Sequence, residues 1–248
     1  TIPGTEDDNP ESTLTVPMFE GDEVIGVLSL GQSGIKFDES DVEKIKAFAR
    51  QAEMAIQRAS DMERLHELTK DLMKSKIKIQ ELIKYIAKLE SCKSEEQIIE
   101  IAGEAAEKIL DFDISTIDKV EGNEFVVKHI SSGVPEEGSL NRKIGEGDLG
   151  SKTYRTQRSY TVDDLRDYRD AKPVKDEYRS AISIPIGEYG VFQAVSTQVG
   201  FFDEEDLQIA ELLMLNVAEA IERVKVYDRE EFLLKILRHD LKNKNQII

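Results

Sequence analysis

The chain has 248 residues and a formal net charge of −17, and 33% of its residues are charged. This length allows one large or two ordinary domains. The negative charge argues against nucleic acids and anionic membranes as partners, because both bind basic surfaces.

Cysteine content and hydropathy exclude further classes of protein. A single cysteine, Cys92, excludes an internal disulfide framework, and no residue spacing matches a metal site or a nucleophilic triad. No apolar run reaches the roughly 20 residues of a transmembrane helix, and the N-terminus does not resemble a signal peptide. We therefore expect a cytoplasmic location and no membrane contact for this portion.

The first regular elements are two strands and a helix. After an acidic loop over residues 1–12, strands are expected at residues 13–17 and 24–30, joined by a Glu-Gly-Asp-Glu hairpin turn. A helix follows, with Asp38 as its N-cap and Asp41 as the partner in a capping box.

The same order of elements returns near the C-terminus. Residues 181–186 and 191–197 form a second strand pair, and a Phe-Asp-Glu-Glu-Asp run opens a second helix at Phe202. The offset between Phe37 and Phe202 persists through both helices, which indicates one domain type present twice. The first copy starts late in this order and lacks its early strands, so we treat the chain as part of a longer protein.

A helical linker lies between the two copies. Residues 59–89 contain no glycine or proline, and apolar residues recur there at every seventh position. One position of this heptad seam holds Leu65, Leu72, Ile79 and Ile86, and the other holds Leu68, Leu82 and Leu89, with Ser75 as an interruption. A parallel homodimeric coiled coil would bury the seam. Alternatively, its later half packs on its own domain, and we expect both in part.

The second copy is complete and runs from residue 80 to residue 224. Ser94 and Gln97 cap a helix that extends to Leu110. Strands are expected at residues 114–120, 124–131, 141–144, 160–162, 181–186 and 191–197, with a short helix at residues 148–156. Because most strands are joined as hairpins with helices at both ends, we predict an α+β fold. It consists of an antiparallel sheet flanked by helices, with long coiled-coil-like connecting helices.

A glycine-rich run at residues 145–150, Gly-Glu-Gly-Asp-Leu-Gly, matches a pattern that binds nucleotide phosphates. That function requires a buried strand and a parallel βαβ unit around the run. Here the flanking strands are short and polar. A glycine turn that enters a short helix is therefore the favoured interpretation, and phosphate binding is the alternative.

Candidate ligand-binding residues lie on one strand and in or beside the polar loop 163–179. His129 alternates with Phe125 and Val127, so it points either into a packed core or toward a ligand. The loop mixes aromatic and charged side chains, as small-molecule pockets do, and the alternative is a solvated surface loop. The candidates are His129, Tyr160, Asp163, Arg166, Tyr168 and Tyr178.

The C-terminal residues 236–248 follow a helical pattern. Leu234, Leu237, Leu241 and Ile248 form a narrow apolar stripe. His239 projects from nearly the opposite side, with Asp240 as its neighbour and Asn243 one turn further. An imidazole beside a carboxylate can act as a nucleophile, and the alternative is a surface histidine at a polar helix end. Between this helix and the preceding one, the only place where a change of helix register is expected is Tyr227-Asp228.

The order strand, proline, hairpin, Phe-Asp-Glu-x-Asp, helix resembles the C-terminal half of a GAF domain. It occurs at Pro17 with residues 37–41 and again at Pro185 with residues 202–206, and the glycine turn at residues 145–150 also resembles GAF proteins. The resemblance implies a small-molecule or chromophore sensor and a dimerisation module. The Asn-Lys half of the cyclic-nucleotide motif and a bilin-attaching cysteine have no counterpart, so the cofactor is unknown.

Residues 237–243, Leu-Arg-His-Asp-Leu-Lys-Asn, resemble the H-box of sensor histidine kinases, in the form found in archaeal GAF-containing sensors. The resemblance implies that His239 is the phosphoacceptor that attacks the γ-phosphate of ATP. It implies that Asp240 is the adjacent acid/base, and that Asn243 positions water when the partner response regulator is dephosphorylated. The ATP-binding boxes of the family are not matched, so we expect this portion not to bind ATP and to be inactive alone.

We therefore expect the sensory portion of a two-component sensor histidine kinase. Its expected parts are the end of a first GAF domain (1–59), a helical linker (60–79), a complete GAF domain (80–224) and a signalling helix that begins the phosphoacceptor helix (225–248). The expected partners are a second copy in a parallel homodimer, a response regulator and a small-molecule ligand. The alternatives are a GAF-containing transcriptional regulator and a structural dimerisation module without a ligand.

Overall fold

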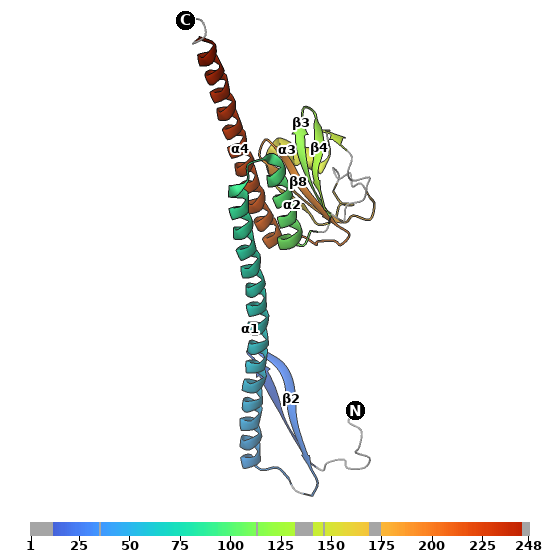
Figure 1. Cartoon of the computed structure of the whole chain (residues 1–248). Helices are drawn as coiled ribbons and strands as arrows, with labels where there is room; N and C mark the ends of the chain where they lie inside the picture. The colour runs from blue at the N-terminus through green and yellow to red at the C-terminus, as the bar shows by residue number, and fades with distance from the viewer. Residues whose placement is uncertain are drawn as a thin grey trace. The chain divides into compact units, whose positions relative to one another are not determined.

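A computed structural model describes residues 12–34, 36–112, 114–131, 141–145, 147–168 and 175–244 (Figure 1). The chain divides into two compact units, residues 1–74 and residues 75–248. The helix α1 (Glu39–Ser91) contributes to both units.

Unit 1 consists of a β-hairpin and the first part of α1. Its strands are β1 (Ser12–Glu20) and β2 (Glu23–Gln32), which pair antiparallel. Gly21 in the connecting turn has a φ of +60°, a conformation that favours a residue without Cβ. The hairpin is joined to α1 by a hydrogen bond from Phe19 N to Glu53 Oε1 of 2.7 Å, and Ile45 of α1 is buried. The predicted strand pair and its turn are thus confirmed.

Unit 2 is built on a six-stranded sheet with the strand order β5-β4-β3-β8-β7-β6. The strands are β3 (Ser115–Glu121), β4 (Glu124–Ile130), β5 (Arg142–Lys143), β6 (Tyr160–Val162), β7 (Ser180–Ile186) and β8 (Gly190–Ser196). All described pairings in this sheet are antiparallel. The predicted α+β class with an antiparallel sheet and flanking helices is confirmed.

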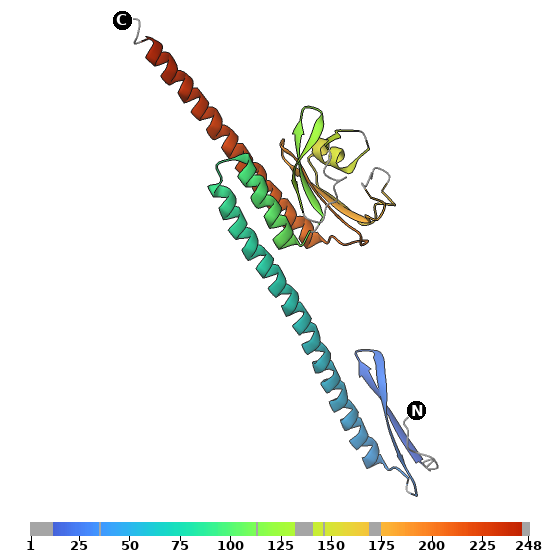
Figure 2. The same cartoon turned by 45° about the vertical axis from the view of Figure 1, so that its right-hand side comes forward.

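Two helices cover one face of this sheet, α2 (Glu95–Leu110) and the first part of α4 (Glu204–Lys244), and the end of α1 packs beside them (Figures 1 and 2). They form the main core with the central strands, where Ile98, Ile117, Ile182, Phe192 and Leu213 are completely buried. Burial of a side chain of this size contributes roughly 1.5–3 kcal/mol. The hydrophobic effect therefore holds the helices against the sheet.

The opposite face of the sheet carries α3 (Leu149–Thr156). A second apolar cluster lies on this side and consists of Leu149, Val162, Leu165, Tyr178 and Ala181. Asp148 caps α3, because its Oδ1 accepts from Ser151 N over 2.8 Å. A hydrogen bond of 2.7 Å between the buried hydroxyls of Thr153 and Ser183 fastens α3 to β7.

The helix caps show the sequence repeat in three dimensions. At the start of α1, Asp41 N donates to Asp38 Oδ1 over 2.9 Å, as predicted. At the start of α4, Asp206 N donates to Asp203 Oδ1 over 2.8 Å. In both caps the second aspartate accepts from the backbone N of the first. The two copies therefore open their last helices with the same reciprocal capping box.

The residues of the heptad seam predicted in the linker helix differ in solvent exposure between the two units. In unit 2, Leu82 and Leu89 are 2% and 1% exposed, because they belong to the main core. In unit 1, Leu65 and Leu72 are 62% and 70% exposed. The later half of the seam thus packs on its own domain, as expected in part, and a coiled coil over the earlier half stays a prediction.

Helix α4 is a single helix of 41 residues. It passes Tyr227 without a break, since the segment contains neither glycine nor proline. Among the described residues, no helix combines the length and apolar character needed to cross a membrane.

Candidate functional site

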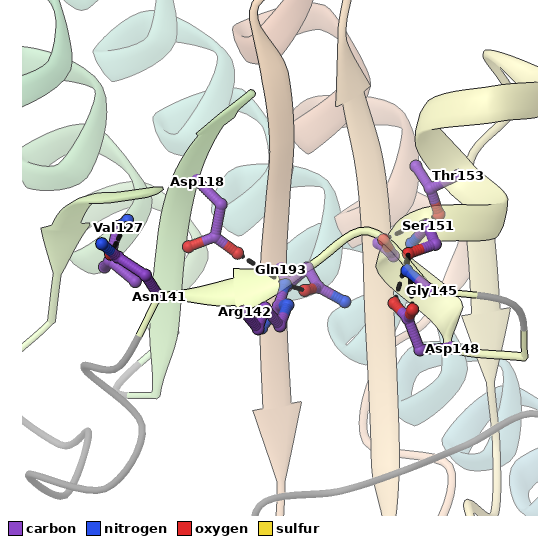
Figure 3. A network of polar contacts seen from close by, with 10 residues as sticks. Asp118, Val127, Asn141, Arg142, Gly145, Asp148, Ser151, Thr153 and Gln193 are labelled. Atoms are coloured by element: carbon purple, nitrogen blue, oxygen red, sulfur yellow. Dashed lines mark hydrogen bonds and ion pairs between the residues drawn. The ribbon is translucent and has the colours of Figure 1, made fainter. Parts of the chain in front are cut away.

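Three polar side chains meet on the sheet face that carries α3. Arg142 of β5 donates from Nη2 to Asp118 Oδ2 of β3 over 2.6 Å, and also to Gln193 Oε1 of β8 (Figure 3). Arg142 lies 24 residues from Asp118 and 51 from Gln193 in the sequence. The sheet topology brings these residues together, and we call them the polar floor.

The Arg142 side chain is oriented by an aromatic residue as well. Its guanidinium lies 5.1 Å from the ring centroid of Phe125, which is fully buried on β4. Phe125 in turn packs edge-on against Tyr154 of α3. Because β4 lies between β5 and β3, the arginine crosses Phe125 to reach Asp118. Stacking and ion pairing together hold the guanidinium in one orientation.

The Asp118 side chain is only 1% exposed. Burial raises the pKa of this carboxyl above its ordinary value, while the Arg142 guanidinium and the Thr116 hydroxyl oppose the increase. Asp118 Oδ1 and Arg142 Nε are both buried, and neither has a hydrogen-bond partner in the described part of the chain. Buried polar atoms without partners destabilise a fold, so these two atoms indicate a place for water or a ligand.

The described part of the glycine run leads into α3. Gly147 has a φ of +82°, which favours glycine. Gly150 lies against the polar floor, since a Cβ there would be 2.9 Å from Gln193 Oε1 and 3.2 Å from Arg142 Nη2. The favoured interpretation, a turn entering a short helix, is confirmed. The phosphate-binding alternative requires a parallel strand pair, and none occurs among the described strands.

The three candidate tyrosines lie on the α3 side of the sheet. Tyr178 is buried in the second apolar cluster, and Tyr160 and Tyr168 pack against it. Lys152 Nζ of α3 lies 4.5 Å from the Tyr160 ring centroid and 5.1 Å from that of Tyr168, and it donates to Tyr168 Oη over 2.6 Å. The tyrosines therefore surround a lysine of α3.

Asp163 and Arg166 are exposed on the surface of the polar loop. The neighbouring Asp164 forms a two-pronged ion pair with Arg179, whose Nε donates to Oδ1 over 3.2 Å and whose Nη2 donates to Oδ2. This guanidinium and the backbone N of Arg166 hold the pKa of Asp164 below its ordinary value. Residues 169–174 of the predicted loop lie outside the described residues.

His129 lies on the other face of the sheet. The β3–β4 register shifts between the pairs Ile117–His129 and Asp118–Val127, which is a β-bulge. The expected alternation with Phe125 and Val127 is broken at this bulge, because an extra residue reverses the face to which the next side chains point. His129 is thus separated from the candidate tyrosines by the sheet.

The imidazole of His129 packs directly against α2. A Cβ on Gly103 of α2 would overlap the imidazole ring. The ring is half-buried, and its Nε2 is buried without a hydrogen-bond partner among the described residues. Burial lowers the pKa of His129, and the carboxylates of Glu107 and Glu100 oppose this decrease.

A groove of about 380 Å³ opens beside His129. It is lined by Glu95, Glu96, Ile99, Glu100, Lys128, His129 and Tyr189. At its edge, Glu95 Oε1 accepts from Lys119 Nζ over 2.7 Å and from Tyr189 Oη over 3.2 Å. Most polar groups at this edge are therefore already paired with one another.

The predicted phosphoacceptor, His239, is exposed near the end of α4. Asp240 and Asn243 follow on the same helix, and their side chains lie outside the described residues. The roles of these three residues stay predictions. The described residues contain no group of three histidine, cysteine or carboxylate side chains that could hold a metal ion.

The sequence-based candidates did not include the polar floor. One feature of the sequence does point to this site. Asp118 follows Ile117 inside a strand, and a carboxylate buried there requires a polar partner. The identity of that partner was not available, because Arg142 and Gln193 lie on strands that are distant in the sequence. Of the predicted candidates, Tyr160, Tyr168 and Tyr178 share a sheet face with the polar floor.

These features define an α+β domain with helices on one sheet face and a polar floor under a short helix on the other. The model of the GAF domain family matches residues 3–57 and 92–222, and the chain belongs to this family. The two matched segments correspond to the two copies of the sequence repeat. The chain therefore carries a GAF sensory domain, a module of signalling and ligand binding. No curated protein matches the sequence.

Solved structures support the same fold. The GAF domain of a phosphoenolpyruvate-protein phosphotransferase from Coxiella burnetii has a TM-score of 0.55 at 18% identity, over 62% of this chain and 98% of that one. A free methionine-R-sulfoxide reductase from Neisseria meningitidis has a TM-score of 0.55 at 15% identity, over 62% and 93%. A GAF sensor protein from Burkholderia vietnamiensis has a TM-score of 0.52 at 19% identity, over 61% and 97%. At these identities the similarity establishes the fold alone.

Proposed function

We propose that this chain is the sensory portion of a cytoplasmic two-component sensor histidine kinase, in which the GAF domain controls phosphorylation of His239. The continuity of α4 is the main support. Its first part contributes Leu213 and Val217 to the main core, and the same uninterrupted helix carries the exposed His239. A movement of the helix in the core is thus transmitted along one rigid element.

In the proposed reaction, His239 is the nucleophile. One ring nitrogen attacks the γ-phosphorus of ATP, so that an N–P bond forms while the O–P bond to the departing ADP breaks. Asp240 accepts the proton released from the other ring nitrogen. Asn243 positions water when the phosphoryl group on the partner response regulator is hydrolysed.

We propose a small molecule at the polar floor as the signal. Asp118 and Gln193 belong to the polar floor, while their neighbours Ile117 and Phe192 belong to the main core on the other sheet face. A ligand that displaces Asp118 or Gln193 therefore moves strands that also contact the helices. This arrangement joins ligand binding to α4 through adjacent residues of the same strands.

We further propose a parallel homodimer formed by the two long helices. Exposed apolar side chains are Leu65, Leu68 and Leu72 on α1 and Leu233, Leu234 and Leu237 on α4. A second copy would cover these side chains, and sliding or rotation of paired α4 helices would present or hide His239.

The phosphoacceptor role is tested in the full-length protein that contains this chain. After incubation with ATP labelled in the γ-phosphate, we expect acid-labile, base-stable label on His239, identified by mass spectrometry. His239→Gln should lose the label completely, because glutamine has no nucleophilic ring nitrogen.

His66→Gln is the matched control, since His66 is also an exposed histidine on a long helix. This variant should keep the label of the unaltered protein. Label that persists in His239→Gln, or that is lost equally in both variants, would contradict the proposal.

A further inference from the structure

The polar floor contains opposite charges that already balance. The Asp118 carboxylate and the Arg142 guanidinium form an ion pair of 2.6 Å, and Gln193 adds no net charge. An anionic ligand would compete with Asp118 for the guanidinium and leave a buried carboxylate unpaired. A cationic ligand would compete with Arg142 in the same way. Both outcomes are costly at a site as buried as Asp118, so the charge balance favours a ligand without net charge.

The unused atoms of the polar floor define the hydrogen bonds that such a ligand must make. Asp118 Oδ1 can accept a hydrogen bond, and Arg142 Nε can donate one; both are buried and without partners in the described residues. In Figure 3, Asp118 points one carboxylate oxygen toward Arg142 and the other away from it. A complementary ligand therefore presents a donor and an acceptor close together.

The side of the polar floor next to α3 is already filled. Gly150 approaches so closely that even a methyl group would be 2.9 Å from Gln193 Oε1 and 3.2 Å from Arg142 Nη2. The unpartnered atoms belong instead to Asp118 and Arg142, on the part of the sheet that includes Phe125. We thus place the ligand over β3 and β4 rather than beneath α3.

We propose that the polar floor binds a small molecule without net charge through a carboxamide-like edge, an N–H group beside a carbonyl oxygen. The N–H donates to Asp118 Oδ1, and the carbonyl oxygen accepts from Arg142 Nε. This inference rests on the proposed ligand-sensing function and specifies the chemical class of the ligand.

Three molecules of nearly equal size test the proposal on the unaltered protein: acetamide, acetate and acetamidinium. Acetamide has both a donor and an acceptor and no charge, acetate only acceptors, and acetamidinium only donors. We expect acetamide to shift the backbone amide NMR signals of Asp118 and Val127, with an affinity at least about 10-fold above the other two, the value of one good hydrogen bond. Equal or tighter binding of either ion, shifts confined to other residues, or no binding would overturn the proposal.

A variant that removes the negative charge of Asp118 provides a second, independent test. In Asp118→Asn the positive charge of the Arg142 guanidinium is no longer neutralised by a carboxylate. The binding preference of the protein should therefore move from acetamide to acetate. Asp61→Asn, at an exposed aspartate of α1, is the matched control and should keep the original preference. If Asp118→Asn folds and still prefers acetamide, the proposal is contradicted. If this variant does not fold, the comparison of the three molecules on the unaltered protein remains the test.

The same measurements separate this inference from the proposed kinase function. Binding is detected directly and requires no phosphorylation. If acetamide binds as expected while His239 is never labelled, the kinase function fails and the ligand class stands. If His239 is labelled while acetamide shows no preference, the ligand class fails alone.

Discussion

His129 and Gly103 occupy positions that depend on each other. The imidazole fills the space that a side chain on Gly103 would take, and its Nε2 is buried without a partner in the described residues. The groups that face it are Glu100 and Glu107 from α2, with Lys128 as its neighbour on β4. Burial lowers the pKa of His129 despite the two carboxylates. The folded protein therefore favours the neutral imidazole.

This preference predicts a loss of stability in acid. In the unfolded chain a histidine binds a proton near its ordinary pKa of about 6.5. Because the folded-state pKa is lower, the unfolded state binds more protons as the pH falls below that value, and stability decreases. We expect the melting temperature to fall between about pH 7 and pH 5 by more in the unaltered protein than in His129→Gln.

His66→Gln serves as the control, because it removes a histidine from an exposed position of α1. If the melting temperature of His129→Gln changed with pH in the same way as that of the unaltered protein, the prediction would be wrong. His129 would then bind protons equally in the folded and unfolded states.

The helices differ in what holds them in place. α2 and the first part of α4 are fixed by the main core, whereas α4 beyond Val224 has only exposed side chains as far as His239. Helix formation over this second part depends on local hydrogen bonds and on neighbouring molecules. In the proposed function, the connection of this second part to the core is the point at which transmission of the signal is most easily interrupted.

A proline at Tyr227 tests this connection. Tyr227→Pro removes a helical hydrogen bond and destabilises the helix locally by about 3 kcal/mol. We expect acetamide binding at the polar floor to be unchanged and the ligand dependence of His239 phosphorylation to be lost. Tyr227→Ala, which keeps the helix, should retain both. Retained ligand dependence in Tyr227→Pro would show that the signal does not travel along α4.

Two copies of the chain can associate only if the attraction between them exceeds the repulsion between their negative charges. Each copy carries a net charge of −17, so association is opposed by repulsion that salt screens. The apolar residues exposed on α1 and α4 supply the opposing attraction in the proposed homodimer.

Sedimentation equilibrium provides the measurement. We expect a dimer that becomes tighter at higher ionic strength, and we expect Leu65→Glu with Leu72→Glu to weaken it at least about 10-fold, because charges would face each other across the seam. Lys70→Glu, also on exposed α1 surface but off the seam, is the control for added negative charge. A monomer at tens of micromolar in the unaltered protein would exclude the dimer.

The sequence by itself determined the elements whose cause is local. Hairpins follow from turn residues such as Gly21, helix starts from capping residues such as Asp38 and Ser94, and long helices from the absence of glycine and proline. The repeat in the sequence also predicted two copies of one domain type, and the GAF family match covers both. The hairpins, the helix starts and the long helices depend on residues close together in the chain.

Only the tertiary structure decided which residues meet. A one-residue bulge in β4 sends His129 to the α2 side of the sheet, although simple alternation would place it with Phe125. Asp118 and Arg142 form the polar floor only because β3 and β5 pair with β4 on either side. Register and strand order are set by long-range packing of the core, which no local pattern encodes. For that reason the fold class was predictable and the polar floor was not.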